Sequence, residues 1–294
     1  YGIKVEIIGG QGPAHYERIK TERRMGQRSG DVMEAAVSVL FGMKDERLLG
    51  QIKDLPAIRD KDMWVLDPLV LDPDGYIAGH GGSWAVPIIN TRLVPTGSEP
   101  KGYRDLLKPE WKGKILFGNP LTASAGCVMY AALLNRGLLD SAYFEALGKQ
   151  VGGVSEHMAY TARKVGAGEF PIALWTSSSF NAPVVLEGAP IAALSMEEGD
   201  PYSLMALALI EGAPHSNAAK VFLNWMYGKE AATFKAEKTN LKGTDSLLKG
   251  VLSAVPKAAV PPMEKRIVFT KKDFEDGVRL HNEKYFARIW NMLR

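Results

Sequence analysis

The stretch KILFGNPLTASAGCVMYAALLN, residues 114–135, carries the pattern from which the fold is predicted. Residues 114–117 are typical of a short buried strand, and a helix is expected from Cys127 onward. Small and hydroxyl-bearing residues, 122–126, connect the two. The stretch FPIALWTSSS, residues 170–179, repeats the arrangement of a strand followed by small residues. Strands separated by helices of this length favour parallel pairing, so the pattern predicts an α/β fold.

The segments on either side extend this alternation. Further expected elements are strands at 3–8, 31–33, 76–80, 84–89 and 203–210, and helices at 14–28, 35–49 and 272–293. In a further helix, one apolar face is predicted from the spacing of Ala218, Val221, Phe222, Trp225 and Met226. The last third of the chain is therefore expected to be mainly helical.

Composition limits the class of protein. The chain has 294 residues, 46% hydrophobic and 23% charged, which fits a globular protein of two domains at about 150 residues each. A net charge of +3 is too small to predict binding to nucleic acid or an anionic membrane. The single cysteine, Cys127, excludes an intrachain disulfide and CxxC-type zinc or redox sites. No run of about 18 apolar residues predicts a membrane span.

Common catalytic motifs are missing from the sequence. There is neither a phosphate-binding GxxxxGK loop nor an HExxH pair. Gly10-Gln11-Gly12 lies between an expected strand and helix, but His15 stands where a dinucleotide-binding loop would have its third glycine. The five histidines are scattered without the spacing of metal ligands. The sequence therefore predicts no catalytic residue, no metal site and no cofactor.

Three loops of small residues, 9–13, 122–126 and 176–179, each follow an expected strand and precede an expected helix. Backbone N–H groups can approach a ligand closely in such loops, and the helix N-terminus adds partial positive charge. In open α/β sheets, ligands bind beyond the carboxyl ends of the strands. The loops therefore predict a site that holds oxygen-bearing groups without reacting with them. The same residues also fit plain turns and helix caps, and Trp84 and Trp175 are expected in the core.

Four segments resemble a known family. YRDLLKPEWKGKI at 103–115, VPIINT at 86–91, VGAGEFPI at 165–172 and APHSNAAK at 213–220 are similar to ABC-importer solute-binding proteins. The group is the type 2 periplasmic family that includes ferric-ion, thiamine, polyamine and phosphonate receptors. The resemblance covers nearly the whole chain, and APHSNAAK is its most specific match.

The resemblance implies an α/β fold of two lobes that close on a ligand, each a mostly parallel sheet flanked by helices. It places residues 1–89 and 206–294 in the first lobe and 90–205 in the second, with crossover strands near 84–90 and 203–210.

The family's ligand contacts are carried over residue by residue. They would be Gly10, Gln11 and Gly12 in the first lobe, and Ser124, Ala125, Gly126, Tyr160, Ser177 and Ser178 in the second. Ferric-binding members have adjacent tyrosines near the position of Ser177-Ser178, and this sequence has no adjacent tyrosines. Because serine hydroxyls are poor iron ligands at neutral pH, direct ferric binding through a tyrosine pair is not expected.

The resemblance implies a periplasmic or extracellular receptor, anchored to the membrane if a leader precedes Tyr1. It would capture a small ligand, expected to be an organic anion, in an interlobe cleft and pass it to a membrane ABC permease. We expect a monomer that is not an enzyme and binds no nucleic acid. A cationic ligand with Glu34 or Glu198 as counter-charge stays open, as do an enzyme on the same fold and a ligand-sensing domain.

Overall fold

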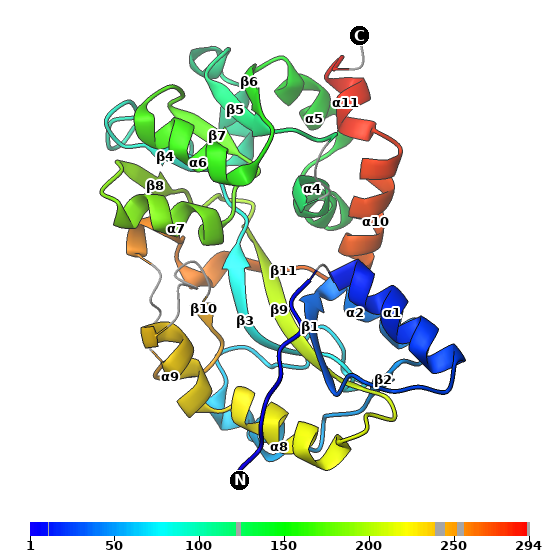
Figure 1. The fold of residues 1–294 in the computed structure, drawn as a ribbon. Coiled ribbons are helices and arrows are strands. Elements are labelled where there is room, and N and C mark those ends of the chain that lie inside the picture. The colour runs from blue at the N-terminus through cyan, green and yellow to red at the C-terminus, as the bar shows by residue number, and fades with distance from the viewer. Residues whose placement is uncertain (11, 122–124, 239–244, 252–255, 293–294) are drawn as a thin grey trace. The chain divides into compact units, whose positions relative to one another are not determined.

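The computed structural model describes residues 1–10, 12–121, 125–238, 245–251 and 256–292 (Figure 1). Contacts group the chain into two compact units. The first comprises Tyr1–Gly82, Leu204–Asn240 and Asp245–Ser253, and the second Ser83–Ser203, Leu241–Thr244 and Ala254–Arg294. The chain leaves the first unit within one strand, β3 (Ala78–Trp84), and returns within another, β9 (Asp200–Ile210). The lobe boundaries at 89 and 206 stay a prediction. The grouping by contacts places residues 254–294 in the second unit, whereas the prediction places them in the first lobe.

The first unit is built on a sheet in which β1 (Val32–Ala36), β2 (Leu49–Gly50) and β10 (Asp245–Ser246) form antiparallel pairs. The sheet also contains the adjoining parts of β3 and β9, in the order β1-β9-β3-β10 with β2 also on β9. Its helices are α1 (Gly12–Arg24), α2 (Val37–Asp45), α3 (Pro56–Arg59), α8 (Ser216–Met226) and α9 (Lys229–Lys238). β1 and β2 pair antiparallel with β9, and β10 with β3. The mostly parallel sheet expected here is therefore wrong for the first unit.

The second unit has a mixed sheet with a parallel centre. Its strands are β4 (Ile88–Asn90), β5 (Ile115–Gly118), β6 (Val151–Ser155), β7 (Ile172–Leu174) and β8 (Ile191–Ala193), in the order β6-β5-β7-β4-β8. β5 pairs parallel with β7, as predicted, and also with β6, a strand that the sequence does not predict, whereas β4 is antiparallel to β7 and β8. The short β11 (Arg266–Val268) is not part of this sheet; it pairs parallel with the start of β9, in the sheet of β1, β2, β3 and β10. The strand–loop–helix pattern therefore predicts the parallel pair of β5 and β7 correctly.

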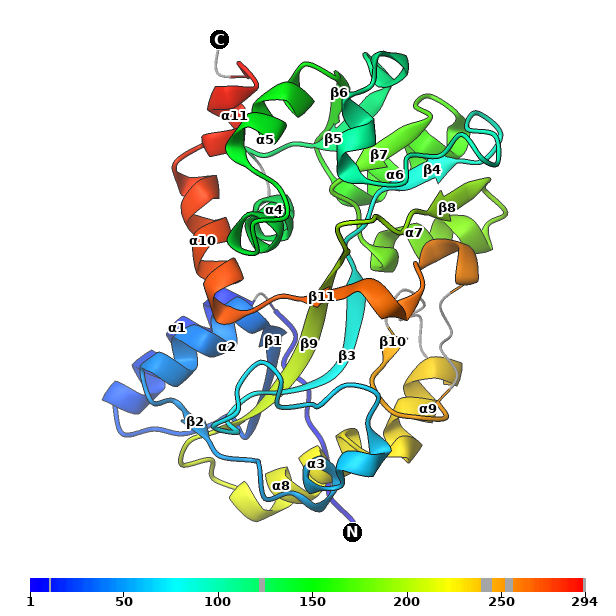
Figure 2. The same cartoon turned by 180° about the vertical axis from the view of Figure 1, so that it is seen from behind.

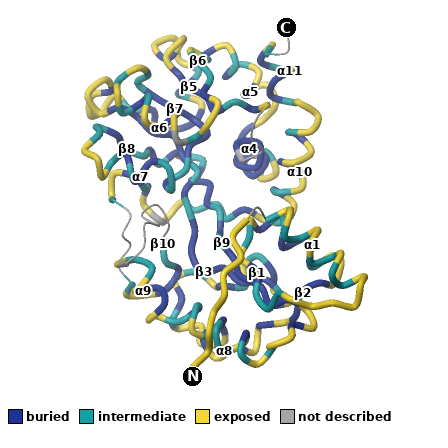
Figure 3. The backbone as a smooth tube through the Cα atoms, viewed as in Figure 1, coloured by how far each residue is buried: buried dark blue, intermediate teal, exposed yellow. Residues whose placement is uncertain are grey.

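Helices cover the second unit's sheet. They are α4 (Ala125–Asn135), α5 (Ser141–Gly148), α6 (Met158–Ala167), α7 (Ser178–Leu186), α10 (Lys271–Asn282) and α11 (Tyr285–Ile289). α10 packs closely on α4, because a Cβ at Gly277 would overlap the backbone of Val128. Trp175 lies in the core among Phe117, Tyr130 and Trp290. In the buried-residue colouring of Figure 3, α4 is dark blue along much of its length.

Several expected elements differ from the observed ones. Residues 1–9 form no strand and are exposed, since no described strand pairs with them. The expected strand 84–89 is split, because Pro87 has no N–H to donate to a sheet. The expected final helix is two helices, interrupted where Lys284 takes a left-handed φ of 53°.

The apolar face predicted for α8 is also displaced. Ala219 and Leu223 are its buried residues, while the side chain of Trp225 is 39% exposed. α8 packs beside α3 (Figure 2), where the backbone N–H of Ala57 donates to the side chain of Asn224 at 2.9 Å. The helix therefore buries Ala219 and Leu223 and places Asn224 against α3, instead of burying the face that hydrophobic spacing alone predicts.

Candidate functional site

Three loops of the second unit meet at one edge of its sheet. Because β6, β5 and β7 are parallel neighbours, their carboxyl ends lie on the same side. Each strand is followed by a helix that begins at that edge: α4 after β5, α6 after β6 and α7 after β7. We call this the sheet-edge site, defined by Asn119, Gly126, 155–160 and 175–178. Its helices direct their N-termini, which carry partial positive charge, to one region.

Trp175 joins two of these loops. It follows β7 directly with a φ of 60°, a left-handed conformation that is strained for a bulky residue, and its side chain is 2% exposed. A Cβ at Gly126 would overlap the Trp175 indole ring, so only glycine lets α4 begin against this ring. One buried side chain therefore fixes where α4 begins relative to the loop that leads into α7.

The two serines after Trp175 have different surroundings. Ser177 is the N-cap of α7, and its hydroxyl oxygen accepts a hydrogen bond from the Ser179 N–H at 3.4 Å. A hydroxyl that accepts in this way still has its own proton to donate. Ser178 is fully buried, and its hydroxyl oxygen accepts from the Trp84 N–H at 3.0 Å. Ser177 is therefore the better placed of the two to contact a ligand.

The loop after β6 completes the edge. The side-chain amide of Asn119 donates to both carboxylate oxygens of Glu156 at 2.9 Å, and so connects this loop to the end of β5. The His157 ring lies edge-on to those of Tyr160 and Phe180, at centroid distances of 6.0 and 5.8 Å. The loop therefore contacts both α6 and α7. The Tyr160 side chain is 63% exposed, which leaves it accessible to a ligand.

The structure brings some of the predicted contact residues together. Gly126, Tyr160, Ser177 and Ser178 belong to the sheet-edge site, whereas Gly12 is the first residue of α1 in the first unit and Gly10 lies before that helix. Gln11 and Ser124 lie outside the described residues, and Ala125 is described only as the first residue of α4. Whether any of these residues contacts a ligand stays a prediction.

The sequence does not predict Asn119, Glu156 or His157 as residues of the site. Glu156 follows β6 directly. The sequence of β6 is VGGVS, and its two glycines leave too little apolar pattern to predict a strand. Without that strand, the loop at 156–157 had no predicted place in the sheet.

A polar cluster joins three elements of the first unit. The Nε2 atom of His80, on β3, lies 3.1 Å from a carboxylate oxygen of Glu34 on β1. The ammonium of Lys235, on α9, lies 3.0 Å from Nδ1 of the same ring. Burial lowers the pKa of His80 and the pKa of Lys235, while the hydrogen bond from His80 lowers the pKa of Glu34. The buried imidazole therefore links the carboxylate of Glu34 to the amine of Lys235.

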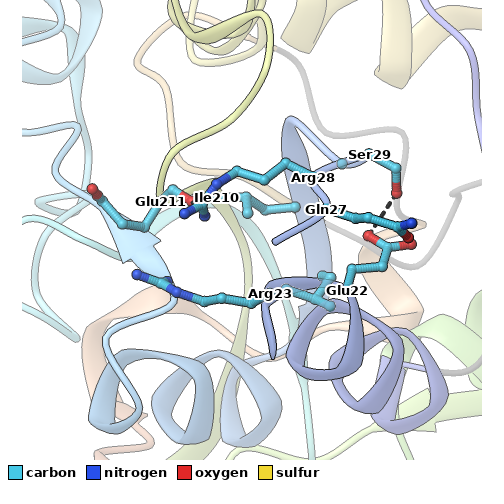
Figure 4. Close-up of a pocket in the computed structure, with 9 residues that line it drawn as sticks. Glu22, Arg23, Gln27, Arg28, Ser29, Ile210 and Glu211 are labelled. Carbon is cyan, nitrogen blue, oxygen red and sulfur yellow. Dashed lines mark hydrogen bonds between the residues drawn. The ribbon is translucent and has the colours of Figure 1, made fainter. Parts of the chain in front are cut away.

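A shallow pocket in the first unit lies between the end of α1 and the end of β9 (Figure 4). Its charged groups are used within the protein. Ser29 donates to Glu22 at 2.7 Å, Arg28 donates to the Glu211 carbonyl at 3.1 Å, and Arg23 donates to the Arg47 carbonyl at 2.8 Å. These bonds compete with any ligand, so the pocket is a weaker candidate than the sheet-edge site.

The described residues offer few alternatives for chemistry. They contain no group of three or more His, Cys, Asp and Glu side chains placed to hold a metal ion. Burial raises the pKa of the Cys127 thiol to about 12, so it is protonated at neutral pH. Within the part of the chain that is described, no helix combines the length and apolar character required to cross a bilayer.

Comparisons with known proteins are consistent with a binding role. A model of the family of bacterial extracellular solute-binding proteins matches residues 38–260. A protein of Salmonella typhimurium, described as a candidate 2-aminoethylphosphonate-binding periplasmic protein, is 28% identical over 247 residues, 80% of this chain and 68% of that protein.

Solved structures share the fold. A Trichodesmium protein in complex with iron and citrate has a TM-score of 0.78 at 19% identity, with 98% of this chain and 91% of that one covered. A periplasmic binding protein of Actinobacillus pleuropneumoniae, with exogenous fructose-6-phosphate bound, has a TM-score of 0.65 at 17% identity, covering 98% and 89%. These likenesses confirm the predicted periplasmic-binding-protein fold.

Proposed function

Since this chain belongs to the bacterial extracellular solute-binding proteins, we propose that it captures a small oxyanion at the sheet-edge site and delivers it unaltered to a membrane ABC permease. The protein would act in the periplasm or at the outer face of the cell. The resemblance first drawn from four short segments is confirmed by the family match over residues 38–260.

The meeting of three helix N-termini is the observation that carries the proposal. α4, α6 and α7 begin at the carboxyl ends of adjacent parallel strands. Unpaired N–H groups at a helix start, together with the helix dipole, favour a phosphate-like or carboxylate group. The Ser177 hydroxyl and the exposed Tyr160 phenol add neutral donors. Such an arrangement binds negative charge without providing a nucleophile.

A phosphonate or phosphate ester is the ligand class we favour. The Salmonella relative is described as binding a phosphonate, and one structural neighbour was solved with a sugar phosphate. Another neighbour holds iron with citrate. The sequence has no adjacent tyrosines to supply the phenolate pair of ferric receptors, and serine hydroxyls are poor substitutes. A phosphorus oxyanion therefore fits the donors better than a bare ferric ion.

The hydrogen bonds of His80 argue against the alternative that the protein is an enzyme using this histidine. An ammonium group only donates hydrogen bonds, so Lys235 requires Nδ1 of His80 to accept, and the ring proton must lie on Nε2, facing Glu34. Both ring nitrogens are thus engaged, and neither is available to take a proton from a substrate. The cluster therefore favours binding over acid–base catalysis.

Calorimetric titration tests the proposal, with 2-aminoethylphosphonate, methylphosphonate and inorganic phosphate as probes. The wild-type protein should bind at least one of them. Ser177→Ala should weaken that binding about tenfold, because it removes a hydroxyl donor from the site.

Thr270→Ala provides the matched control, since Thr270 is a hydroxyl N-cap of α10 in the same unit. It should lower the melting temperature and leave the affinity unchanged. Mass spectrometry of solute released from the purified protein should recover an intact oxyanion. Recovery of cations alone, or equal affinity of wild type and Ser177→Ala, would contradict the proposed site.

A further inference from the structure

The last residues of the sheet-edge site hold Trp84 in place. The Thr176 hydroxyl donates to the Val86 carbonyl at 2.7 Å, and the Ser178 hydroxyl oxygen accepts from the Trp84 N–H at 3.0 Å. Both of these hydroxyl side chains are buried, and all four residues belong to the second unit. The position of Trp84 is therefore fixed relative to the sheet-edge site.

Trp84 in turn packs against an arginine. The guanidinium carbon of Arg266, on β11, lies 5.5 Å from the centre of the Trp84 ring and 4.7 Å from that of Tyr202 on β9. All three residues belong to the second unit, in which β11 runs beside the start of β9 (Figure 2). Stacking of this kind occupies the flat faces of a guanidinium and leaves the N–H groups at its edge for other partners.

The guanidinium of Arg266 has no counter-charge in the described part of the chain. No described carboxylate forms an ion pair with it, and its Nε atom is buried without a hydrogen-bond partner. Asp200 lies opposite Arg266 in the register of β11 on β9. Its carboxylate instead accepts from the Ser195 hydroxyl at 2.7 Å and from the Met196 N–H at 2.9 Å. The acid opposite Arg266 is therefore engaged elsewhere.

A second stacked arginine of the same unit is paired. The Arg104 guanidinium lies 6.0 Å from the centre of the Tyr143 ring and 3.4 Å from the Asp140 carboxylate. Arg266 is partly buried and has no such acid among the described residues, and an unpaired charge costs more free energy there than at the surface. Aromatic stacking therefore accounts for the orientation of Arg266 but not for its lack of a counter-charge.

The sheet-edge site lacks the positive charge that Arg266 carries. The residues that define the site include no lysine or arginine, and one of them, Glu156, is an acid. Helix N-termini supply only partial positive charges. A phosphorus oxyanion, which carries one or two full negative charges, is therefore not neutralised by these residues alone.

We propose that Arg266 is the cationic binding residue of the sheet-edge site, and that its edge N–H groups bind two oxygens of the solute's oxyanion. The fork of donors on a guanidinium matches two oxygens of a phosphonate, phosphate or carboxylate group. Trp84 and Tyr202 are positioning residues for Arg266. The inference rests on the proposed function and adds to it the residue that selects for a full negative charge.

Calorimetric titration with methylphosphonate tests the role of Arg266, because the oxyanion is the only charged group of this probe. Arg266→Gln should weaken binding about 10- to 100-fold, since it removes charge-assisted hydrogen bonds. It should also make the affinity less sensitive to NaCl, because the interaction that salt screens is lost. Arg266→Lys keeps the charge but not the planar fork of donors, so it should restore only part of the affinity.

Arg104→Gln is the matched control, because it removes the same charge from a stacked arginine of the same unit. It should leave the affinity and its dependence on NaCl unchanged. If Arg266 only supports the fold, Arg266→Gln will lower the melting temperature and leave the affinity unchanged. That result would overturn the inference.

NMR of the wild-type protein gives a second measurement, which does not depend on the stability of a variant. In isotopically labelled protein, the Nε–H signal of Arg266 should shift when methylphosphonate is added, and that of Arg104 should not. An unchanged Arg266 signal at saturation would overturn the inference and leave the oxyanion receptor standing. If the wild type binds none of methylphosphonate, inorganic phosphate and 2-aminoethylphosphonate, the proposed function fails and the role of Arg266 fails with it.

Discussion

The hydrogen-bond chain through His80 determines how that residue titrates. Burial lowers its folded-state pKa below the ordinary value of about 6.5. Glu34 and Lys235 face the ring from β1 and α9 and act in opposite directions, Glu34 raising the pKa and Lys235 lowering it. Desolvation is the largest of these effects, so the ring stays neutral in the folded protein at neutral pH.

Because the His80 ring is neutral in the folded protein, we predict that the free energy of unfolding decreases in acid. As the pH falls below about 6.5, the unfolded chain binds a proton at His80 that the folded protein does not bind, which favours unfolding. The stability contribution is therefore complete above about pH 6.5 and is lost as the pH falls toward the lowered pKa. His80→Gln should flatten the dependence of the free energy of unfolding on pH between 7 and 5, by up to about 1.4 kcal/mol per pH unit.

Urea denaturation across this pH range measures the effect. His215→Gln serves as the control, because it removes a histidine whose side chain is 72% exposed. That variant should keep the wild-type slope. An identical slope in His80→Gln and wild type would show that the buried ring does not cause the acid sensitivity.

At the scale of elements, the sheet-edge site depends on where α4 begins. Gly126 lies against the Trp175 ring, and Trp175 is held by Phe117, Tyr130 and Trp290. The start of α4 and the end of β7 therefore act as one packed assembly. A substitution at the contact of Gly126 with Trp175 should displace the backbone N–H groups at the start of α4 without removing any of them.

Gly126→Ala is expected to destabilise the protein by about 1–3 kcal/mol, because overpacking in a dense core has this cost. It should also weaken oxyanion binding. Adding Trp175→Leu should recover part of both losses, because the smaller side chain makes room for the new methyl group. A double-mutant cycle measured by urea denaturation gives the coupling free energy, and strictly additive effects would contradict the packing described here.

The sequence predicts some helices and strands of this site but not others. Apolar runs followed by small residues mark β5, β7 and the helices after them, so the pattern predicts these elements. The sequence VGGVS has little apolar signal, so it predicts neither β6 nor the position of the loop that carries Glu156 and His157. No glycine or proline marks the break at Lys284, so the sequence does not predict it.

At the scale of the whole molecule, short family-like segments predicted the fold better than local patterns did. The expected class is confirmed by structural neighbours, and the family by the match over 38–260. The packing of residues 254–294 was not predictable, because it depends on contacts between distant residues, such as Gly277 with Val128 and Trp290 with Phe117. Likewise, nothing in the spacing of Glu34, His80 and Lys235 predicts that they meet.

The central claim is that helix N-termini at one sheet edge hold the solute's oxyanion. Amide hydrogen exchange, with and without saturating 2-aminoethylphosphonate, tests it most directly. We expect slower exchange in the first turns of α4, α6 and α7 on binding, and unchanged exchange in α5, which lies elsewhere in the same unit. Saturated binding that leaves the starts of those three helices unchanged would contradict it.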